Sequence, residues 1–481
     1  MNTISRRNFL KHSSLAAAGV ALSAQSWGQV DGANDDIRVG VIGLKGRGQA
    51  HLSEFNNMRG VRITALCDVD KDVLDGEVAK FKKNNRDVEA NIDIRKLLES
   101  KNVDVIALAT PNHWHALGTI WGVQAGKDVY VEKPISHNVF EGRKAVEAAR
   151  KYSKIVQGGT QARSSTAIRE AIAWVNAGNI GKIKIARGLC YKPRPSIGKV
   201  SGAQKVPASI DYDLWCGPAP MDPLMRAKLH YDWHWIWDFG NGDLGNQGVH
   251  QMDVARWFLG EKELSPRVFA VGGRLGYEDD GETPNTMMIF HDYKKAPLIF
   301  EVRGLPEKSG STQMDKYKDA SIGVIVECEN GHVVVSSNYG QATAFDKDSR
   351  EIKKFEGNTN HFENFIKAVR SRKQSDLNGD ILEGHISAAL CHTGNISYRL
   401  GKPSSPQQIL EAIKSDEGAT ETFERMAIHL EANGVDLEKT KATLGAVLKM
   451  DTKMERFRNH SAANKLLTRD YRKPFVVPDK I

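Results

Sequence analysis

The stretch that decides the fold is residues 37–48, which read Ile37-Arg38-Val39-Gly40-Val41-Ile42-Gly43-Leu44-Lys45-Gly46-Arg47-Gly48. Its first half is a β-branched run that predicts a short strand, and its second half is a glycine-rich turn. A helix-like stretch follows over residues 49–58, and a second strand over residues 61–67 ends at Asp68. Strand, glycine turn, helix, strand and acid in this order predict a dinucleotide-binding unit.

The turn and the acid have separate chemical tasks in such a unit. Glycines let the backbone approach a pyrophosphate, and the helix N-terminus offers free N–H groups and a partial positive charge. Asp68 can accept hydrogen bonds from ribose hydroxyls, and its charge disfavours a 2′-phosphate. We therefore predict NAD as the cofactor, with NADP less favoured. The middle position of the turn is Lys45 instead of glycine, so its side chain either alters the seat of the pyrophosphate or supplies a charge to it.

Two further strands end in polar residues. Residues 103–109 are almost wholly apolar, as central parallel strands are, and residues 128–131 form another short strand. Ligands of an open α/β sheet bind beyond the carboxyl ends of its strands. This topology places the following residues at the cofactor edge: Asn112, His113, His115, Glu132 and Lys133. A helix over residues 139–151 and a strand over residues 155–157 complete the predicted unit.

The composition excludes several classes of protein. The 481 residues are 40% hydrophobic and 26% charged, which is ordinary globular usage, and no apolar run reaches the roughly 20 residues of a membrane span. Lys and Arg number 67 against 59 Asp and Glu, and they are scattered, so we expect no nucleic acid as a partner. The five cysteines stand singly, without a Cys-x-x-Cys pair.

The N-terminus has the layout of a signal peptide, which we assign to residues 1–28. Ser5-Arg6-Arg7-Asn8-Phe9-Leu10-Lys11 precedes an apolar, Ala-rich run over residues 15–24. The paired arginines resemble the bacterial twin-arginine export signal, whose substrates cross already folded. We therefore expect a periplasmic protein that is exported with its cofactor aboard. A short amphipathic anchor or an accidental arginine pair is the alternative.

Taken together, these features resemble the Gfo/Idh/MocA family of sugar and polyol oxidoreductases over residues 37 to 401. The resemblance rests on the glycine turn with Arg47, on Asp68, Thr110-Pro111…His115 and Glu132-Lys133-Pro134, and on residues 240–250. It implies that the residues that hold the cofactor are Gly43, Lys45, Gly46, Arg47, Gly48, Asp68, Thr110, Asn112, His115, Glu132 and Lys133.

The resemblance also implies the domain organisation. We expect an α/β protein with an N-terminal Rossmann domain over residues 36–160 and a C-terminal α/β domain with a large open mixed sheet over residues 161–404. That sheet often forms the oligomer interface in the family, so we expect a homo-oligomer, a dimer or a tetramer. Residues 405–481 are rich in Glu and Lys and have helical spacing, which predicts a helical C-terminal appendage.

The family's catalytic residues carry over to Lys133 and His250. The resemblance implies that the Lys133 ammonium polarises a carbonyl oxygen or stabilises an alkoxide, and that His250 is the general base of alcohol oxidation. The family often has an aspartate four residues before this histidine, where the chain has Asn246, which cannot take a proton. Asp253 lies one helical turn after His250 and is either structural or orients the histidine, and Asp243 is a second candidate acid.

Other residues are candidates for contact with a substrate. Three tryptophans lie within residues 230–238, and Trp233 among them could pack on the C–H face of a sugar, or the loop could simply shield the cofactor. The candidates for substrate contact are Gln161, Arg163, Trp233, Asn246, His250 and Asp253. The spacing of the three histidines between residues 230 and 250 fits no metal motif, so we expect no metal.

These patterns predict an exported NAD-dependent oxidoreductase that acts on a sugar, glycoside or polyol. Two alternatives stay open. One is an NAD-dependent glycosidase, which oxidises a sugar transiently, eliminates the leaving group and restores the hydroxyl. The other is a non-catalytic carbohydrate-binding protein, which the departures at Lys45 and Asn246 keep open, although the retained Lys133 and His250 argue against it.

Overall fold

The computed structural model describes residues 36–481, so the expected signal peptide over residues 1–28 lies outside the described residues. The first sheet has six parallel strands in the order β3-β2-β1-β4-β5-β6. The strands are β1 (Ile37–Ile42), β2 (Val61–Cys67), β3 (Glu89–Asn91), β4 (Val105–Leu108), β5 (Asp128–Val131) and β6 (Val156–Gly158). The expected strands thus form one parallel sheet, and the predicted Rossmann fold is confirmed.

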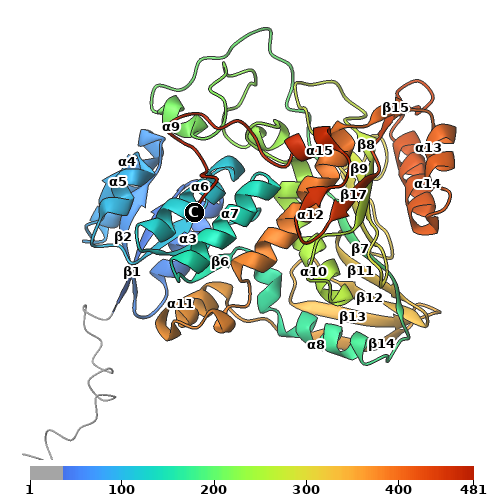
Figure 1. Ribbon diagram of the computed structural model, residues 1–481, viewed down its shortest axis with the longest axis horizontal. Coiled ribbons are helices and arrows are strands. Elements are labelled where there is room, and N and C mark those ends of the chain that lie inside the picture. The colour runs from blue at the N-terminus through green and yellow to red at the C-terminus, as the bar shows by residue number, and fades with distance from the viewer. Residues whose placement is uncertain (1–35) are drawn as a thin grey trace, which may run out of the picture.

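Helices cover both faces of this sheet (Figure 1). They are α3 (Arg47–Asn56), α4 (Lys71–Lys83), α5 (Ile94–Glu99), α6 (Asn112–Gln124) and α7 (Val139–Lys151). Apolar side chains of α5, α6 and α7 form one core with the sheet, and those of α3 and α4 form another core on the opposite face. Central strands that are buried on both faces explain why residues 103–109 read as a continuous apolar run.

The Rossmann domain is completed by a helix from far along the chain. Helix α11 (His361–Ser371) packs Phe362 and Phe365 into the core of α3, where the Phe362 ring stacks on Tyr130 at 4.5 Å between ring centroids. Our expected domain boundary at residue 160 leaves this helix out. No local pattern marks α11 as part of the first domain, because its amphipathic face would fit any apolar surface.

The second sheet has twelve strands and is mixed, because β7 and β10 pair in parallel while the other pairs are antiparallel. The strands are β7 (Ile183–Tyr191), β8 (Arg267–Gly273), β9 (Thr286–His291), β10 (Leu298–Arg303), β11 (Ile322–Cys328), β12 (Gly331–Val335), β13 (Gln341–Asp346), β14 (Glu351–Glu356), β15 (Lys402–Ser404), β16 (Ala442–Leu444), β17 (Leu448–Asp451) and β18 (Arg456–Phe457).

Three helices cover the inner face of this sheet with a large apolar core. They are α8 (Thr166–Asn176), α10 (Val249–Leu259) and α12 (Ile381–Arg399). The shorter helices are η1 (Gln161–Ser164), α9 (Tyr212–Cys216), η2 (Asp232–Trp235), the π-helix η3 (Leu244–Gly248) and η4 (Gln374–Asp376). No helix within residues 36–481 is long and apolar enough to cross a membrane.

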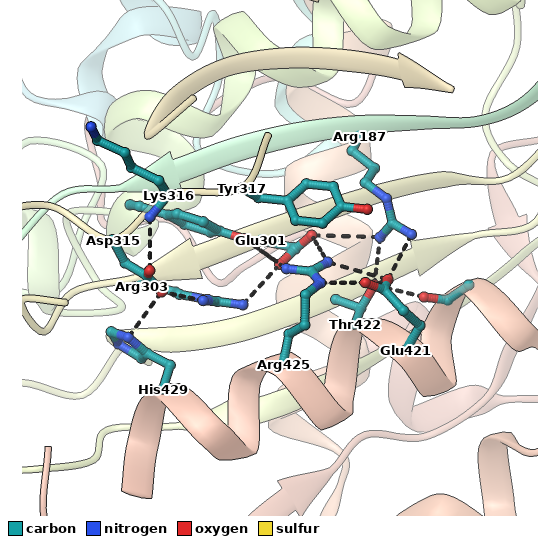
Figure 2. A network of polar contacts seen from close by, with 12 residues as sticks. Arg187, Glu301, Arg303, Asp315, Lys316, Tyr317, Glu421, Thr422, Arg425 and His429 are labelled. Atoms are coloured by element: carbon teal, nitrogen blue, oxygen red, sulfur yellow. Dashed lines mark hydrogen bonds and ion pairs between the residues drawn. The ribbon is translucent and has the colours of Figure 1, made fainter. Parts of the chain in front are cut away.

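The outer face of the sheet is covered over β8 to β10 by α13 (Pro406–Ile413) and α14 (Glu417–Ala432). An ion network fixes α14 there (Figure 2). Buried Glu301 of β10 accepts two hydrogen bonds from Arg425 of α14, at 2.8 and 2.9 Å. Arg187 of β7 reaches Glu421 of α14 at 2.8 Å. The predicted open sheet therefore has part of its outer face occupied by its own chain.

The C-terminal appendage is helical only in its first part. After α14 the chain forms β16, β17 and β18, the short helix α15 (Ser461–Lys465) and an extended tail. The tail returns to the Rossmann domain, where Phe475 packs edge-on against Trp114 at 5.5 Å between ring centroids (Figure 1). The expectation of a helical segment over residues 405–481 thus fails beyond α14, because β16 and β17 find pairing partners in β8 that sequence spacing does not reveal.

Candidate active site

A cavity of about 730 Å³ lies between the two domains, at the carboxyl ends of β1, β2, β4 and β5. Most of the residues that we assigned to the cofactor line it. They are Gly43, Lys45, Gly46, Arg47, Asp68, Thr110, Asn112, His115, Glu132 and Lys133. The second domain contributes Trp233, Asn246, Gln247 and His250 to the same cavity, and Gln161 lies at the junction. The strand ends therefore meet where the topology predicts.

The glycine turn brings the backbone close to the cavity. A Cβ atom at Gly43, whose φ is +81°, would lie 2.7 Å from the carbonyl oxygen of Ala109, and a Cβ at Gly48 would lie 2.0 Å from the carbonyl oxygen of Gly43. Helix α3 begins here without a side-chain cap. The N–H groups of Gly48 and Gln49 donate to carbonyls of the turn itself, at 3.1 Å each, and the partial positive charge of this helix end fits the pyrophosphate of a dinucleotide.

Asp68 lies at the end of β2, and backbone groups hold it in place. Its carboxylate accepts hydrogen bonds from the N–H of Leu44 at 2.8 Å and from the N–H of Asp70 at 3.0 Å. Burial raises the pKa of Asp68, and these two hydrogen bonds oppose that shift. The carboxylate lines the cavity beside the glycine turn, where the ribose of a dinucleotide would lie. The residues present therefore fit this cofactor.

Glu132 organises the neighbourhood of the turn. Its carboxylate accepts from Arg47 Nε at 2.7 Å and contacts His51 Nε2 at 3.0 Å, while Gln161 Nε2 lies 3.4 Å away. Burial alone would raise the pKa of Glu132, but the hydrogen bond with His51 and the charge of Arg47 hold it well below its usual range. Glu132 therefore stays an anion that anchors α3 to the end of β5. His51 was not predicted, since one histidine on a helix gives no motif.

Lys133 connects the two domains. Its ammonium donates to the backbone carbonyl of Asn246, and the peptide bond between Lys133 and Pro134 is cis. Burial lowers the pKa of Lys133, and the charge of Glu132 opposes this shift. The ammonium therefore lies at the cavity wall between the carboxyl end of β5 and the start of η3.

His250 lies in the first turn of α10, directly after the π-helix η3. Its Nδ1 is buried without a hydrogen-bond partner, and its ring lies 5.5 Å from that of Tyr339 between centroids. Burial lowers the pKa of His250 to about 3, and the charge of Lys133 contributes to the shift. The imidazole is therefore neutral at ordinary pH and can accept a proton. π-Helical turns are frequent at functional sites.

The two candidate acids near His250 are engaged elsewhere. Asp253 forms a bidentate pair with Arg163, at 2.7 and 2.8 Å, and accepts from Ser387 at 2.7 Å. Asp243 pairs with Arg194. Neither Arg163 nor Asp253 lines the cavity. Their expected contact with a substrate therefore gains no support from the geometry, because the buried charges of Asp253 on α10 and of Arg163 neutralise each other outside the cavity.

Of the remaining site residues, some hold neighbouring segments together, and one has a hydroxyl without a partner. Both ring nitrogens of His115 face backbone carbonyls, those of Pro134 at 2.6 Å and Thr110 at 2.7 Å, so this histidine ties two strand ends together. Asn112 donates to Asn241 at 3.2 Å across the domain boundary. The hydroxyl of Thr110 is buried without a partner. It is the one of these groups left free for a ligand.

The aromatic segment forms one wall of the cavity. Trp233 and His234 line it and stack on each other at 3.6 Å between ring centroids, and His230 lies 3.2 Å from Asp70. Within residues 36–481 no group of three or more histidine, cysteine or acidic side chains is arranged to hold a metal ion.

Gln247 and Tyr339 were not singled out by the sequence, although Gln247 lies within the motif over residues 240–250.

Two family models match the chain. The first, described as an oxidoreductase family with an NAD-binding Rossmann fold, matches residues 37–160, and the second, its C-terminal alpha/beta domain, matches residues 178–294. The first domain is therefore an NAD-binding domain, as predicted. The second match covers part of the twelve-stranded sheet and the whole stretch that carries His250.

Individual relatives and solved structures have low sequence identity to this chain. Proteins named glycosyl hydrolase family 109 from Shewanella baltica are 33% identical over 177 residues, which is 32% of this chain and 39% of their own length. The alignment thus spans well under half of those relatives. The WlbA dehydrogenase from Bordetella pertussis, solved with NADH and UDP-GlcNAcA, is 19% identical with a TM-score of 0.54 over 74% of this chain and 94% of that one.

An NAD-binding protein from Listeria innocua is 14% identical, with a TM-score of 0.53 over 75% of this chain and 94% of that one. At such identities the likeness concerns the fold, which is the two-domain arrangement described above. The parallel first sheet, the mixed second sheet and the two matched models agree with one another. The chain therefore belongs to the Gfo/Idh/MocA family of oxidoreductases.

Proposed function

We propose that this protein oxidises a hydroxyl of a sugar, glycoside or polyol, and reduces the corresponding carbonyl in reverse, with a tightly held NAD. The observation that carries the proposal is the convergence of Lys133 and His250, from different domains, on one cavity that also fits a dinucleotide. When bound, NAD supplies the acceptor and donor of a hydride. We assign the acid–base chemistry to residues of the chain itself.

His250 is the proton acceptor in this proposal. Its neutral imidazole takes the hydroxyl proton as the carbonyl forms, and it returns that proton to the oxygen in the reverse direction. The Lys133 ammonium, which already donates to a carbonyl oxygen of Asn246, stabilises the negative charge that develops on the substrate oxygen. Asn246 cannot exchange a proton, so the base has no carboxylate partner of the kind often found in the family.

The residues that hold the cofactor follow from the fit of the cavity. The N-terminus of α3 and the turn at Gly43 would hold the pyrophosphate, and the charge of Lys45 would lie beside it. Asp68 would hold the ribose, and its carboxylate would repel a 2′-phosphate, which supports a preference for NAD over NADP. Trp233 offers an aromatic surface that suits the C–H face of a sugar.

We further propose that the protein is exported by the twin-arginine route to the periplasm and keeps its cofactor bound there. The support is the twin-arginine pattern over residues 5–11 and the scarcity of free NAD outside the cytoplasm. Equilibration of the purified protein with a large excess of NAD-free buffer tests retention, and complete loss of nucleotide contradicts it. Export is tested by replacing Arg6 and Arg7 with Lys and assaying the periplasmic fraction.

The oligomer also remains a proposal. We propose a dimer or tetramer that uses the outer face of the second sheet over β11 to β14, because α13 and α14 occupy that face over β8 to β10. Light scattering of the mature protein tests this, and a monomer at micromolar concentration contradicts it.

The decisive experiment is absorbance spectroscopy of the purified mature protein with a panel of free sugars, polyols and methyl glycosides. We expect bound nucleotide, and a reduced-nicotinamide band that grows or fades with one class of panel member. A protein that binds no nucleotide, and shows no change when NAD is supplied, contradicts the proposal and favours a carbohydrate-binding protein.

A second function deserves the same assay because relatives carry the name glycosyl hydrolase family 109. An NAD-dependent glycosidase would use the same two residues: it oxidises a sugar hydroxyl to a carbonyl, eliminates the glycosidic leaving group, adds water in its place and returns the hydride to restore the hydroxyl. Release of p-nitrophenol from p-nitrophenyl glycosides, without net change in the nicotinamide absorbance, identifies that outcome. Net reduction without release identifies the oxidoreductase.

A further inference from the structure

We propose that Gln247 determines substrate specificity by accepting a hydrogen bond from an O–H or N–H group next to the reacting carbon, and that Tyr339 positions it. The inference rests on the proposed function, because it names a substrate contact within the same cavity. The supporting contacts are a chain of three side chains that runs from the cavity wall to the turn between β12 and β13.

The first link is the amide of Gln247. This residue lies on η3, directly after Asn246 and three residues before His250, and it lines the cavity with both. Its Nε2 donates to the Tyr339 hydroxyl at 3.3 Å and to Gln251 Oε1 at 3.4 Å. Neither Tyr339 nor Gln251 lines the cavity, so the N–H edge of the amide faces away from it.

The second link is Gln251, which pairs with the amide of Gln247 in the orientation that the structure has. Fully buried Gln251 donates its own Nε2 to the Tyr339 hydroxyl at 2.8 Å, so its Oε1 faces Gln247 and needs a donor there. A flip of Gln247 alone would place two carbonyl oxygens against each other. Within residues 36–481 the Oε1 of Gln247 accepts no hydrogen bond. The acceptor of a cavity-lining amide is thus left for a ligand.

The third link is the backbone of Tyr339. Its φ is +57°, in the left-handed region that bulky residues rarely occupy, and its N–H donates to Ser336 at 3.1 Å in a tight turn. In this conformation one side chain contacts both amides and also lies against His250, at 5.5 Å between rings.

The chemistry of an amide oxygen defines what it selects. It accepts hydrogen bonds but carries no charge and takes no proton, so it recognises a donor and does not compete with His250 as the base. The donor is either a hydroxyl vicinal to the reacting carbon or the N–H of an acetamido group. A sugar that lacks the donor would leave the amide oxygen unpaired in a desolvated site, which is the strongest basis for discrimination.

The test compares Q247L and Y339F with the unsubstituted protein, using the panel sugar that changes the nicotinamide absorbance fastest. We expect Q247L to lower kcat/KM by about 10- to 100-fold. We expect Y339F to raise KM about 3- to 10-fold with kcat within about twofold and an unchanged pH profile, because the ring remains against His250. Q341L and Y293F are matched controls outside the cavity, where Gln341 pairs with Glu356 and Tyr293 with Glu263.

A substrate series then separates recognition from a merely structural role. Monodeoxy and acetamido-deoxy derivatives of the same sugar are assayed with both proteins. For one derivative, kcat/KM of the unsubstituted protein should fall by about 10- to 100-fold, whereas kcat/KM of Q247L should fall by less than about threefold. The identity of that derivative shows whether the group that Gln247 recognises is a hydroxyl or an acetamido group. If Q247L lowers kcat/KM equally for every derivative, or lowers it for none of them, this inference is wrong, and the proposed function is unaffected. A panel to which the unsubstituted protein does not respond overturns the proposed function, and this inference with it.

Discussion

The ammonium of Lys133 donates to the backbone carbonyl of Asn246, which lies 113 residues further along the chain. This hydrogen bond joins the segment that follows strand β5 to the middle of the π-helix that precedes His250. A cation from one domain and a neutral imidazole from the other thereby share one cavity. The hydrogen bond from Lys133 to Asn246 thus places Lys133 close to His250, although Asn246 stands where the family often has an aspartate.

Replacing Lys133 tests the cationic partner. We expect K133M to lower the rate of nicotinamide reduction by about 10²- to 10⁴-fold, because the developing charge on the substrate oxygen loses its counter-charge. Bound nucleotide should persist, since the uncapped turn at α3 is unchanged. Stopped-flow absorbance gives the rate, and K199M at an exposed lysine is the control. A loss smaller than about threefold would remove Lys133 from the chemistry.

The pH dependence follows from the depressed pKa of His250. Because burial lowers that pKa to about 3, the imidazole is neutral from pH 5 upward, and oxidation should show no acid limb near the ordinary histidine value of about 6.5. The reverse reaction needs the protonated form, so its rate should fall as pH rises. Single-turnover rates between pH 4.5 and 9 check both slopes. An acid limb at pH 6.5 that vanishes in H250N contradicts the assignment.

The cofactor preference is tested at Asp68. We expect D68S to lose affinity for NAD and to gain affinity for NADP, because the variant removes the charge that repels a 2′-phosphate. Fluorescence titration of nucleotide-stripped protein with NADH and NADPH measures the ratio of the two dissociation constants. D75S, on the exposed surface of α4, is the matched control. An unchanged ratio would mean that another residue reads the ribose.

Stability is tested at Glu301. This carboxylate is buried among Arg187, Arg303 and Arg425, so E301A leaves three guanidinium groups without their shared anion. We expect a loss of about 3–5 kcal/mol of unfolding free energy in urea. The exposed pair of Lys354 and Glu356 provides a control, since K354A should leave the midpoint unchanged. A midpoint for E301A equal to that of the unsubstituted protein contradicts this account.

Much of the Rossmann domain could be predicted because its signals are local. The strand over residues 37–42, the glycine turn and the strand that ends at Asp68 follow one another within 32 residues, and the structure has β1 and β2 with those bounds. Parallel topology then places the ends of β4 and β5 at the same edge. Strand β14 gives no comparable signal, because its sequence is polar and exposed apart from one buried residue, and strand β13 shows only a weak alternation of Ala342 and Ala344.

What the amino-acid sequence by itself determined is therefore the class of fold and the cofactor, and it singled out Lys133 and His250 as the candidate reactive pair. Only the tertiary structure decided that Asp253 pairs with Arg163, that α11 completes the first domain, and that Gln247 is held by Tyr339. The physical reason is distance along the chain. Periodicity and turn chemistry act over a few residues, whereas a buried charge or amide takes whichever partner packing brings within about 3 Å, and these partners lie 90 or more residues away.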